Sequence, residues 1–166
     1  AFAEESRDVA DALSVLGAAL VRSNSFGEAE AISRQALTIN LKLHGADDEA
    51  VAVSRKDLGA LLCSTGRVSA GLAQLSEAAA FFTRHPSVEP RSAVIIRGAY
   101  GSCLTRARRF HEAEAELLRS YEDTLRLGDN PEWRAEAASR LATLYAAWNK
   151  PSEAMKFREA TAPRGK

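Results

Sequence analysis

The feature that most constrains the fold is a sequence that repeats itself at a fixed spacing. The stretch SFGEAEA at residues 25–31 returns as RFHEAEA at residues 109–115, which is 84 residues later. Half of that spacing is 42, and steps of 42 connect Gly17 in VLGAAL, Gly59 in DLGALL and Gly101 in AYGSCL. One further step of 41 residues reaches Ala142 in RLATLY. Self-similarity at a period of roughly 20–50 residues is the signature of repeat architectures, so we expect four related segments, here called repeats 1 to 4.

Around these four small residues the same pattern of residue sizes recurs. A large residue precedes each one, another follows after three positions, and small residues follow after twelve and nineteen. The four columns are Leu16, Leu58, Tyr100 and Leu141; Leu20, Leu62, Leu104 and Tyr145; Ala29, Gly71, Ala113 and Ala154; and Ala36, Ala78, Ser120 and Thr161. Residues three apart share one face of a helix, so the small residues are expected to admit a second helix. Gly101→Leu should then cost roughly 1–3 kcal/mol, whereas Gly71→Ala should be tolerated because the other repeats have Ala there.

The composition favours helices along the whole chain. Gly (10) and Pro (5) are few, and clusters of β-branched residues typical of strands are almost absent. We predict an all-α chain with helices near residues 8–23, 26–43, 48–65, 68–84, 91–107, 110–127, 131–148 and 151–160. Ser25 and Glu28 have the spacing of a capping box, and Pro131 and Pro151 suit the first turn of a helix.

The large–small–large trio, with small residues on the next helix, resembles the tetratricopeptide repeat (TPR) over roughly residues 9–160. The repeat is 42 residues long and has openings such as VADAL and VAVSR, and in both respects it is similar to the long repeats of kinesin light chains. The resemblance implies an α–α superhelix of about four helix–turn–helix repeats. We expect the chain to form a single domain over residues 1–166, with repeats at 9–50, 51–92, 93–133 and 134–160 and a tail at 161–166. The segment RLATLYAAWNKPSEAMKFRE is similar to the last repeat of bacterial proteins that join a Ser/Thr kinase domain to such repeats.

Charge and motif content argue against several other classes of function. The net charge is zero, so there is no electrostatic case for nucleic acid, and no apolar run is long enough for membrane insertion. The chain contains no nucleophile elbow, kinase signature or phosphate loop, and its three histidines have no Cys or carboxylate at metal-ligand spacing. We therefore expect no enzyme activity, cofactor or metal. Cys63 and Cys103 are interpreted as buried thiols of a protein in the reducing cytoplasm.

The resemblance places function on the first helix of each repeat, because first helices line a concave groove in this family. The stripe expected to face that groove is Asp11, Ser14, Ala18 and Val21; Val53, Lys56, Ala60 and Cys63; Ile95, Gly98, Ser102 and Thr105; and Glu136, Ser139, Thr143 and Ala146. Family members grip a C-terminal carboxylate with Lys, Asn and Arg at set columns, of which only Lys56 matches here. The stripe is expected to bind an extended peptide or a partner helix.

A second candidate surface is the turn RARRF, which holds Arg106, Arg108 and Arg109. The turns inside the repeats carry cations and no acid, which indicates a basic edge opposite a more acidic one. The helix dipole offers a local alternative, because cations suit helix C-termini.

These patterns predict a scaffold or regulatory module for protein–protein interaction inside a larger, signalling protein, with a protein or peptide as partner. A sensor domain whose groove binds a small ligand or a short signalling peptide is the alternative. Self-association through the aromatic residues of the last repeat also stays open, beside their use in that repeat's own core; these residues are Trp133, Tyr145, Trp148 and Phe157.

Overall fold

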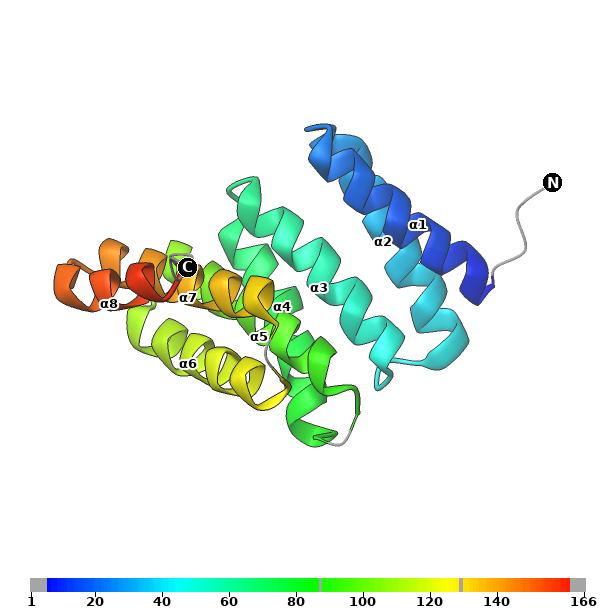
Figure 1. Ribbon diagram of the computed structural model, residues 1–166. Helices are drawn as coiled ribbons and strands as arrows, with labels where there is room; N and C mark the ends of the chain where they lie inside the picture. The colour runs from blue at the N-terminus through cyan, green and yellow to red at the C-terminus, as the bar shows by residue number, and fades with distance from the viewer. Residues whose placement is uncertain (1–5, 87, 129, 162–166) are drawn as a thin grey trace. The chain divides into compact units, whose positions relative to one another are not determined.

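The computed structural model describes residues 6–86, 88–128 and 130–161, and this part of the chain forms α-helices and no strand (Figure 1). The helices are α1 (Arg7–Arg22), α2 (Phe26–His44), α3 (Glu49–Ser64), α4 (Val68–Arg84), α5 (Pro90–Arg106), α6 (Phe110–Arg126), α7 (Pro131–Ala147) and α8 (Pro151–Thr161). Each bound lies within one residue of the range expected from the sequence. The all-α prediction is confirmed.

The turn inside each hairpin is built in the same way at the same column of the repeat. The seventh residue after each small landmark has a left-handed backbone, and these residues are Asn24, Arg108 and Asn149 at φ 59° and Gly66 at φ 88°. The next residue donates its N–H to a carbonyl five positions back, as Ser25 does to Leu20 at 2.9 Å and Arg109 to Leu104 at 3.0 Å. This bond closes the end of the first helix in the manner of a Schellman motif.

The same turn rules out the capping box expected at α2. Ser25 occupies the N-cap position, but its side chain makes no capping hydrogen bond. Its backbone N–H, which Glu28 would have to accept in a capping box, already donates to Leu20. The prediction of a capping box was therefore wrong, because the hairpin turn uses the donor first.

Polar caps and prolines fix where the first helices begin. Asp48 Oδ1 accepts the backbone N–H of Ala50 at 2.8 Å, and Asn130 Oδ1 accepts the N–H of Glu132 at 3.0 Å. Helices α7 and α8 begin at Pro131 and Pro151 as expected, and α5 begins at Pro90. A proline suits this position because the N–H that it lacks would have no partner inside the helix.

The hairpins α1–α2, α3–α4, α5–α6 and α7–α8 group into two compact units. Unit 1 is Ala1–Val88 and holds the first two hairpins, and unit 2 is Glu89–Lys166 and holds the last two. Within unit 1, α3 packs on both α2 and α1; within unit 2, α7 packs on both α6 and α5. This stacking of two hairpins within each unit is typical of helical repeats. The interpretation of residues 1–166 as one domain stays a prediction.

The small residues of the repeat lie where two helices cross. A Cβ atom built on Gly101 would lie 2.5 Å from Leu117 Cγ, so α5 and α6 meet closely there. At Gly71 the neighbours are backbone atoms, because its Cβ would lie 2.7 Å from the carbonyl oxygen of Gly59 and 2.9 Å from the backbone nitrogen of Cys63. The expectation that Gly71 tolerates alanine conflicts with this geometry, since a backbone contact cannot be relieved by a side-chain rotation.

The large residues of the repeat are buried or half-buried, and Leu16 is the exception. Leu58 and Leu141, which precede the small landmarks of repeats 2 and 4, are 1% and 0% exposed, whereas Leu16 in repeat 1 is 46% exposed. Helix α1 packs only on α2 and α3 among the described helices. The side of α1 that carries Leu16 is therefore left open to solvent.

Both cysteines lie in the interior, with exposures of 4% for Cys63 and 1% for Cys103. Neither is a free thiol in this structure. The interpretation of these residues as thiols was therefore wrong, and it gives no argument for a reducing compartment. Two lone cysteines carry no spacing pattern from which their oxidation state could be predicted.

Candidate functional site

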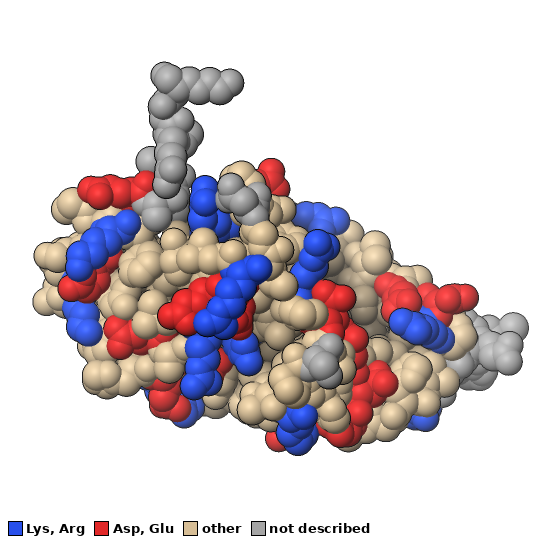
Figure 2. All heavy atoms as spheres, turned by 60° about the horizontal axis from the view of Figure 1, so that its bottom comes forward, with Lys and Arg blue, Asp and Glu red and all other residues tan. Residues whose placement is uncertain are grey.

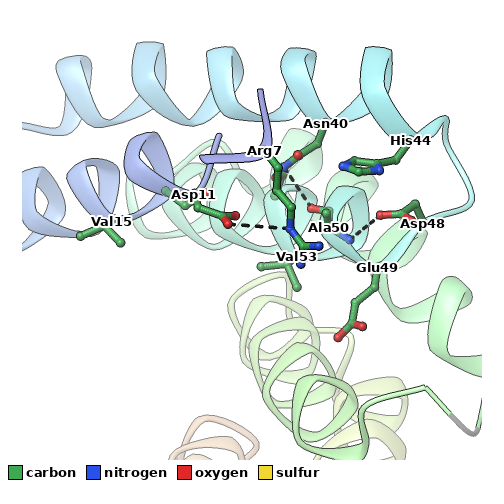
Figure 3. Close-up of a pocket in the computed structure, with 11 residues that line it drawn as sticks. Arg7, Asp11, Val15, Asn40, His44, Asp48, Glu49, Ala50 and Val53 are labelled. Carbon is green, nitrogen blue, oxygen red and sulfur yellow. Dashed lines mark hydrogen bonds and ion pairs between the residues drawn. The ribbon is translucent and has the colours of Figure 1, made fainter. Parts of the chain in front are cut away.

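Three of the predicted groove residues meet in one hollow of unit 1. Asp11 and Ser14 of α1 and Val53 of α3 line a space of about 630 Å³ beside the end of α2 (Figure 3). Its lining is completed by Arg7, Val15, Asn40, His44, Asp48, Glu49, Ala50 and Ser54. The hollow therefore brings together one face of two successive first helices.

The polar side chains that line this hollow differ in how firmly their hydrogen bonds and ion pairs fix them. Arg7 Nε lies 3.9 Å from Asp11 Oδ2, and both side chains are mostly exposed, at 74% and 66%. An exposed ion pair at this distance stabilises little. Asn40 is buried, and its Nδ2 donates to Ser54 Oγ at 2.8 Å. The wall formed by α1, with Arg7 and Asp11, is thus easily rearranged. The wall formed by α2 and α3, with Asn40 and Ser54, is fixed.

A second, smaller hollow lies in unit 2. Ser139 and Thr143 of the predicted stripe line it together with Ala142, Ala146 and Arg158, around a space of about 260 Å³. The hydroxyl of Thr143 donates to the carbonyl of Ser139 at 2.9 Å. That bond satisfies the hydroxyl proton within α7, so a ligand would find only an acceptor and a methyl group there.

The other stripe residues differ in their access to solvent. Ile95 is 47% exposed, and Glu136 is exposed and pairs with Arg140 at 2.6 Å. Ala60 and Ser102 are half-buried, and Ser102 donates to the carbonyl of Gly98 at 2.8 Å. These residues lie partly in unit 1 and partly in unit 2, so one groove through all four repeats stays a prediction.

Thr105 does not belong to an accessible surface, and its inclusion in the stripe was wrong. Its side chain is only 8% exposed, and its hydroxyl donates to the carbonyl of Gly101 at 2.9 Å. Cys63 and Gly98 are buried as well. Column counting placed these residues on the first helix correctly but could not show which face its neighbours cover.

Lys56, the one match to a carboxylate-gripping column, is half-buried and paired with the neighbouring Asp57. The two side chains lie in direct contact. A ligand carboxylate would have to compete with that acid. The arrangement does not support a carboxylate clamp.

The basic edge at Arg106, Arg108 and Arg109 is partly neutralised. Arg109 donates two hydrogen bonds to Glu112, at 2.7 Å and 2.6 Å, and this guanidinium lowers the pKa of Glu112. The Arg108 guanidinium lies 5.3 Å from the ring centroid of Phe110. The turn contains no acid, as predicted, but the first turn of α6 supplies one.

Charges of both signs are interleaved over much of the described surface. Figure 2 shows basic and acidic side chains next to one another on the face it presents. Among the described residues, no cluster of three or more His, Cys, Asp or Glu side chains could hold a metal ion. None of the described helices is long and apolar enough to cross a membrane.

The aromatic residues of the last repeat pack on one another and on rings of α6. Tyr145 is 6% exposed and stacks on Phe157 and Trp148, with centroids 5.7 Å and 6.5 Å away. Its hydroxyl donates to Glu114 at 2.8 Å, and burial together with this bond raises the pKa of Tyr145 to about 12. Trp133 lies apart from them under the guanidinium of Arg91. Most of these residues serve the interior of unit 2.

Sequence reasoning missed Asn40, Arg7 and Asp48 as members of the unit 1 hollow. They lie at the end of α2, at the start of α1 and in the α2–α3 connection, outside the stripe of first-helix columns. The usable signal was Asn40 itself, a polar residue at a column where repeat 2 has Phe82. A polar residue at a core position points to a hydrogen-bonding partner.

Comparison with known proteins identifies the fold. A kinesin light chain-like protein of Podosopora anserina with nearly identical TPR-like repeats matches with a TM-score of 0.72 and 16% identity, over 96% of this chain and 76% of that chain. A form of that protein with one substitution matches with a TM-score of 0.75 and 16% identity, over 96% of this chain and 76% of that chain. BtubC (BKLC) from P. vanneervenii matches with a TM-score of 0.75 and 15% identity, over 95% of this chain and 67% of that chain. No family model and no curated protein matches the sequence. The chain therefore has the fold of the TPR-like helical repeat proteins.

Proposed function

We propose that the chain is a protein–protein interaction module that binds an extended peptide segment of a partner along the exposed faces of its first helices. The observation that carries this proposal is the hollow of unit 1, where Asp11, Ser14 and Val53 of two successive repeats line one space. A ligand bound here contacts two successive repeats, and one that also reaches the other exposed first-helix faces must be elongated across the helices. An extended peptide meets that requirement.

The chemistry of the exposed faces supports the same proposal. Val15 is 70% exposed at the rim of the hollow, and Asp11 lies one helical turn before it. Apolar side chains interspersed with hydrogen-bonding groups offer a peptide both burial of its side chains and contacts for its backbone. We infer that this module has a scaffold or regulatory role in a larger signalling protein, for which the likeness of its last repeat to kinase-linked repeats is the support.

A sensor for a small ligand or a short signalling peptide is the second candidate. The volume of about 630 Å³ favours it, because small-molecule sites occupy roughly 300–1,000 Å³. Such sites bury most of their ligand, however, and this hollow is bordered by the exposed side chains of Arg7, Asp11 and Val15. An open border suits a peptide better.

The test is selection of twelve-residue peptides from a displayed random library on the full chain, followed by affinity measurements on variants. Val53→Arg fills the hollow of unit 1, and Thr143→Arg fills that of unit 2. Ala31→Arg and Ala115→Arg are the matched controls, because both residues are exposed on second helices. We expect at least one hollow variant to weaken binding about tenfold or more, while both controls bind like the unaltered chain.

Two results would contradict the proposed function. One is a library that yields no peptide with saturable binding to the folded chain. The other is a set of peptides whose affinity responds to the second-helix controls but not to Val53→Arg or Thr143→Arg. Circular dichroism of every variant shows whether a lost affinity reflects a lost fold.

A further inference from the structure

The fixed wall of the unit 1 hollow contains an unsatisfied hydrogen-bond acceptor. Asn40 projects from α2 toward Ala50 of α3 (Figure 3), and its Nδ2 donates to Ser54 Oγ at 2.8 Å and to the carbonyl of Ala50 at 3.5 Å. The residue is 3% exposed, and its Oδ1 has no hydrogen-bond partner among the described residues. The orientation of the amide is set by Ala50, because a carbonyl oxygen can only accept.

The repeat shows that packing does not require this polar residue. At the column of Asn40, repeat 2 has Phe82 and repeat 3 has Thr124, both buried. Thr124 satisfies its own hydroxyl by donating to Ser120 at 2.8 Å. At the column of Ser54, the later repeats have Ile96 and Ala137. Among the described residues, only the junction of repeats 1 and 2 combines a buried amide with a buried hydroxyl at these columns, and burial of an unpaired amide oxygen is unfavourable.

The charges around this acceptor favour a cationic ligand. The lining holds three carboxylates, those of Asp11, Asp48 and Glu49, against one guanidinium, that of Arg7. Among the residues that the structure describes, Arg7 pairs with Asp11 through a weak, exposed contact. A ligand cation can therefore replace Arg7 at Asp11 with little loss of stability.

We propose that the unit 1 hollow binds an arginine or lysine side chain of the partner peptide, whose N–H groups donate to Asn40 Oδ1 while Asp11 balances its charge. This inference rests on the proposed function, since it names the chemistry of the peptide that the module binds. Arg7 occupies the approach to the hollow in the free chain and gives way when the peptide binds. Asp48 and Glu49 add negative potential on the α3 side.

The test uses four synthetic libraries of nine-residue peptides with blocked ends and a fluorescent label, with Arg, Lys, Gln or Glu fixed at the centre and mixtures elsewhere. Affinity for the full chain is measured by fluorescence anisotropy. A charge-assisted hydrogen bond should make the Arg or Lys library bind about tenfold tighter than the Gln library. The Glu library should bind most weakly.

Variants locate the preference. Asn40→Leu removes the acceptor at nearly constant volume and should reduce the preference below about threefold. Asp11→Asn should do the same, and it tests the proposal even if Asn40→Leu fails to fold, because Asp11 is exposed. Glu77→Gln is the matched control, since Glu77 is an exposed carboxylate on the second helix α4, outside the first-helix faces, and should change nothing. Arg7→Gln removes the competing cation and should raise the affinity for the basic library about twofold.

Equal affinity for the Arg, Lys and Gln libraries would overturn the proposal. So would a preference that survives both Asn40→Leu and Asp11→Asn, or a weaker basic affinity in Arg7→Gln. If all libraries bind alike but Val53→Arg abolishes binding, this inference fails while the proposed function stands. If no library binds to the folded chain, both fail.

Discussion

Units 1 and 2 share one backbone plan, but each joins its two hairpins through different chemistry. In unit 1 the joint is ionic. Glu30 of α2 accepts a hydrogen bond from Arg67 at the start of α4, at 2.8 Å between Nη1 and Oε1, and a second from Arg34 at 2.9 Å. Chiefly because of the Arg67 bond, the pKa of Glu30 is lowered.

In unit 2 the same two columns form an aromatic joint. Glu114 is the counterpart of Glu30, but it accepts a hydrogen bond from the hydroxyl of Tyr145 at 2.8 Å. Lys150 is the counterpart of Arg67, and its ammonium lies 3.3 Å from the ring centroid of Trp148. This is a cation–π contact. The carboxylate and the cation are both present, yet they do not pair.

The difference separates what the repeat must specify from what it leaves free. Both units need small residues at helix crossings and a left-handed residue at the hairpin turn, since these are constraints on the backbone. The side chains at the joint only have to satisfy one another. An ion pair and an aromatic cluster are equally compatible with the stacking of hairpins.

The largest effect is expected where backbone meets backbone. Gly71→Ala in unit 1 forces a Cβ against Gly59 and Cys63 and should lower the free energy of unfolding by about 1–3 kcal/mol. Gly27→Ala is the matched control, because its Cβ would meet nothing within 4 Å, and it should be neutral or stabilising. Urea unfolding of both variants measures the difference. Equal stability would show that α3 and α4 are not as close as the structure places them.

A smaller loss is expected at the aromatic joint of unit 2. Tyr145→Phe removes the donor to Glu114 and should cost about 0.5–1.5 kcal/mol. The folded pKa of Tyr145 is raised from 10.0 to about 12, so this tyrosine's pH-dependent contribution is complete below about pH 10 and lost as the pH rises toward 12. The stability difference between Tyr145→Phe and the unaltered chain should therefore shrink over that range. A difference that stays constant with pH would contradict the raised pKa.

The hairpin turns of the two units differ in one residue at the left-handed position. A variant that removes this difference should be more stable than the unaltered chain. At the left-handed position unit 1 has Asn24 and Gly66, whereas unit 2 has Arg108 and Asn149. Arginine is strained in this conformation, while asparagine adopts it more readily. Arg108→Asn should raise the stability by about 0.5–1 kcal/mol. A thermal melt with a lower midpoint would indicate that the Arg108 side chain contributes more through Phe110 than its backbone costs.

The ionic joint of unit 1 should contribute less than the aromatic one, because Arg67 is largely exposed and solvent screens the pair. Glu30→Gln should destabilise slightly at neutral pH. The folded pKa of Glu30 lies below its ordinary value of 4.5, so its contribution is present above pH 4.5 and is lost as the pH falls through the folded pKa. Urea unfolding at several pH values should show the two proteins converging in acid. Glu30→Gln curves that stay parallel to those of the unaltered chain would contradict this.

The repeat made the helices predictable from the sequence, because turn residues and period agree at every hairpin. It could not show that Gly71 faces a backbone, since the column that equates it with Ala29 and Ala113 records size and not distance. Nor could it pair Asn40 with Ser54 or Glu114 with Tyr145, because such pairs depend on the angle and distance at which two successive hairpins pack. The candidate site was therefore only half predictable. Its first-helix face followed from the columns, and its buried acceptor did not.

The last comparison sets the hollow of unit 1 against the basic edge of unit 2, and the expected effect of changing that edge is the smallest. Replacing Arg106, Arg108 and Arg109 by glutamine should leave the affinity for the Arg- or Lys-centred peptides within about twofold, because exposed charges are screened beyond about 8 Å at physiological ionic strength. Arg109 is also already paired with Glu112. Anisotropy titrations at low and high salt measure both the affinity and its salt dependence. A tenfold loss of affinity, with a steep salt dependence that the triple variant abolishes, would move the binding surface from the hollow to the edge. It would also mean that acidic residues flanking the central Arg or Lys bind the edge, because a basic residue gains nothing from three arginines.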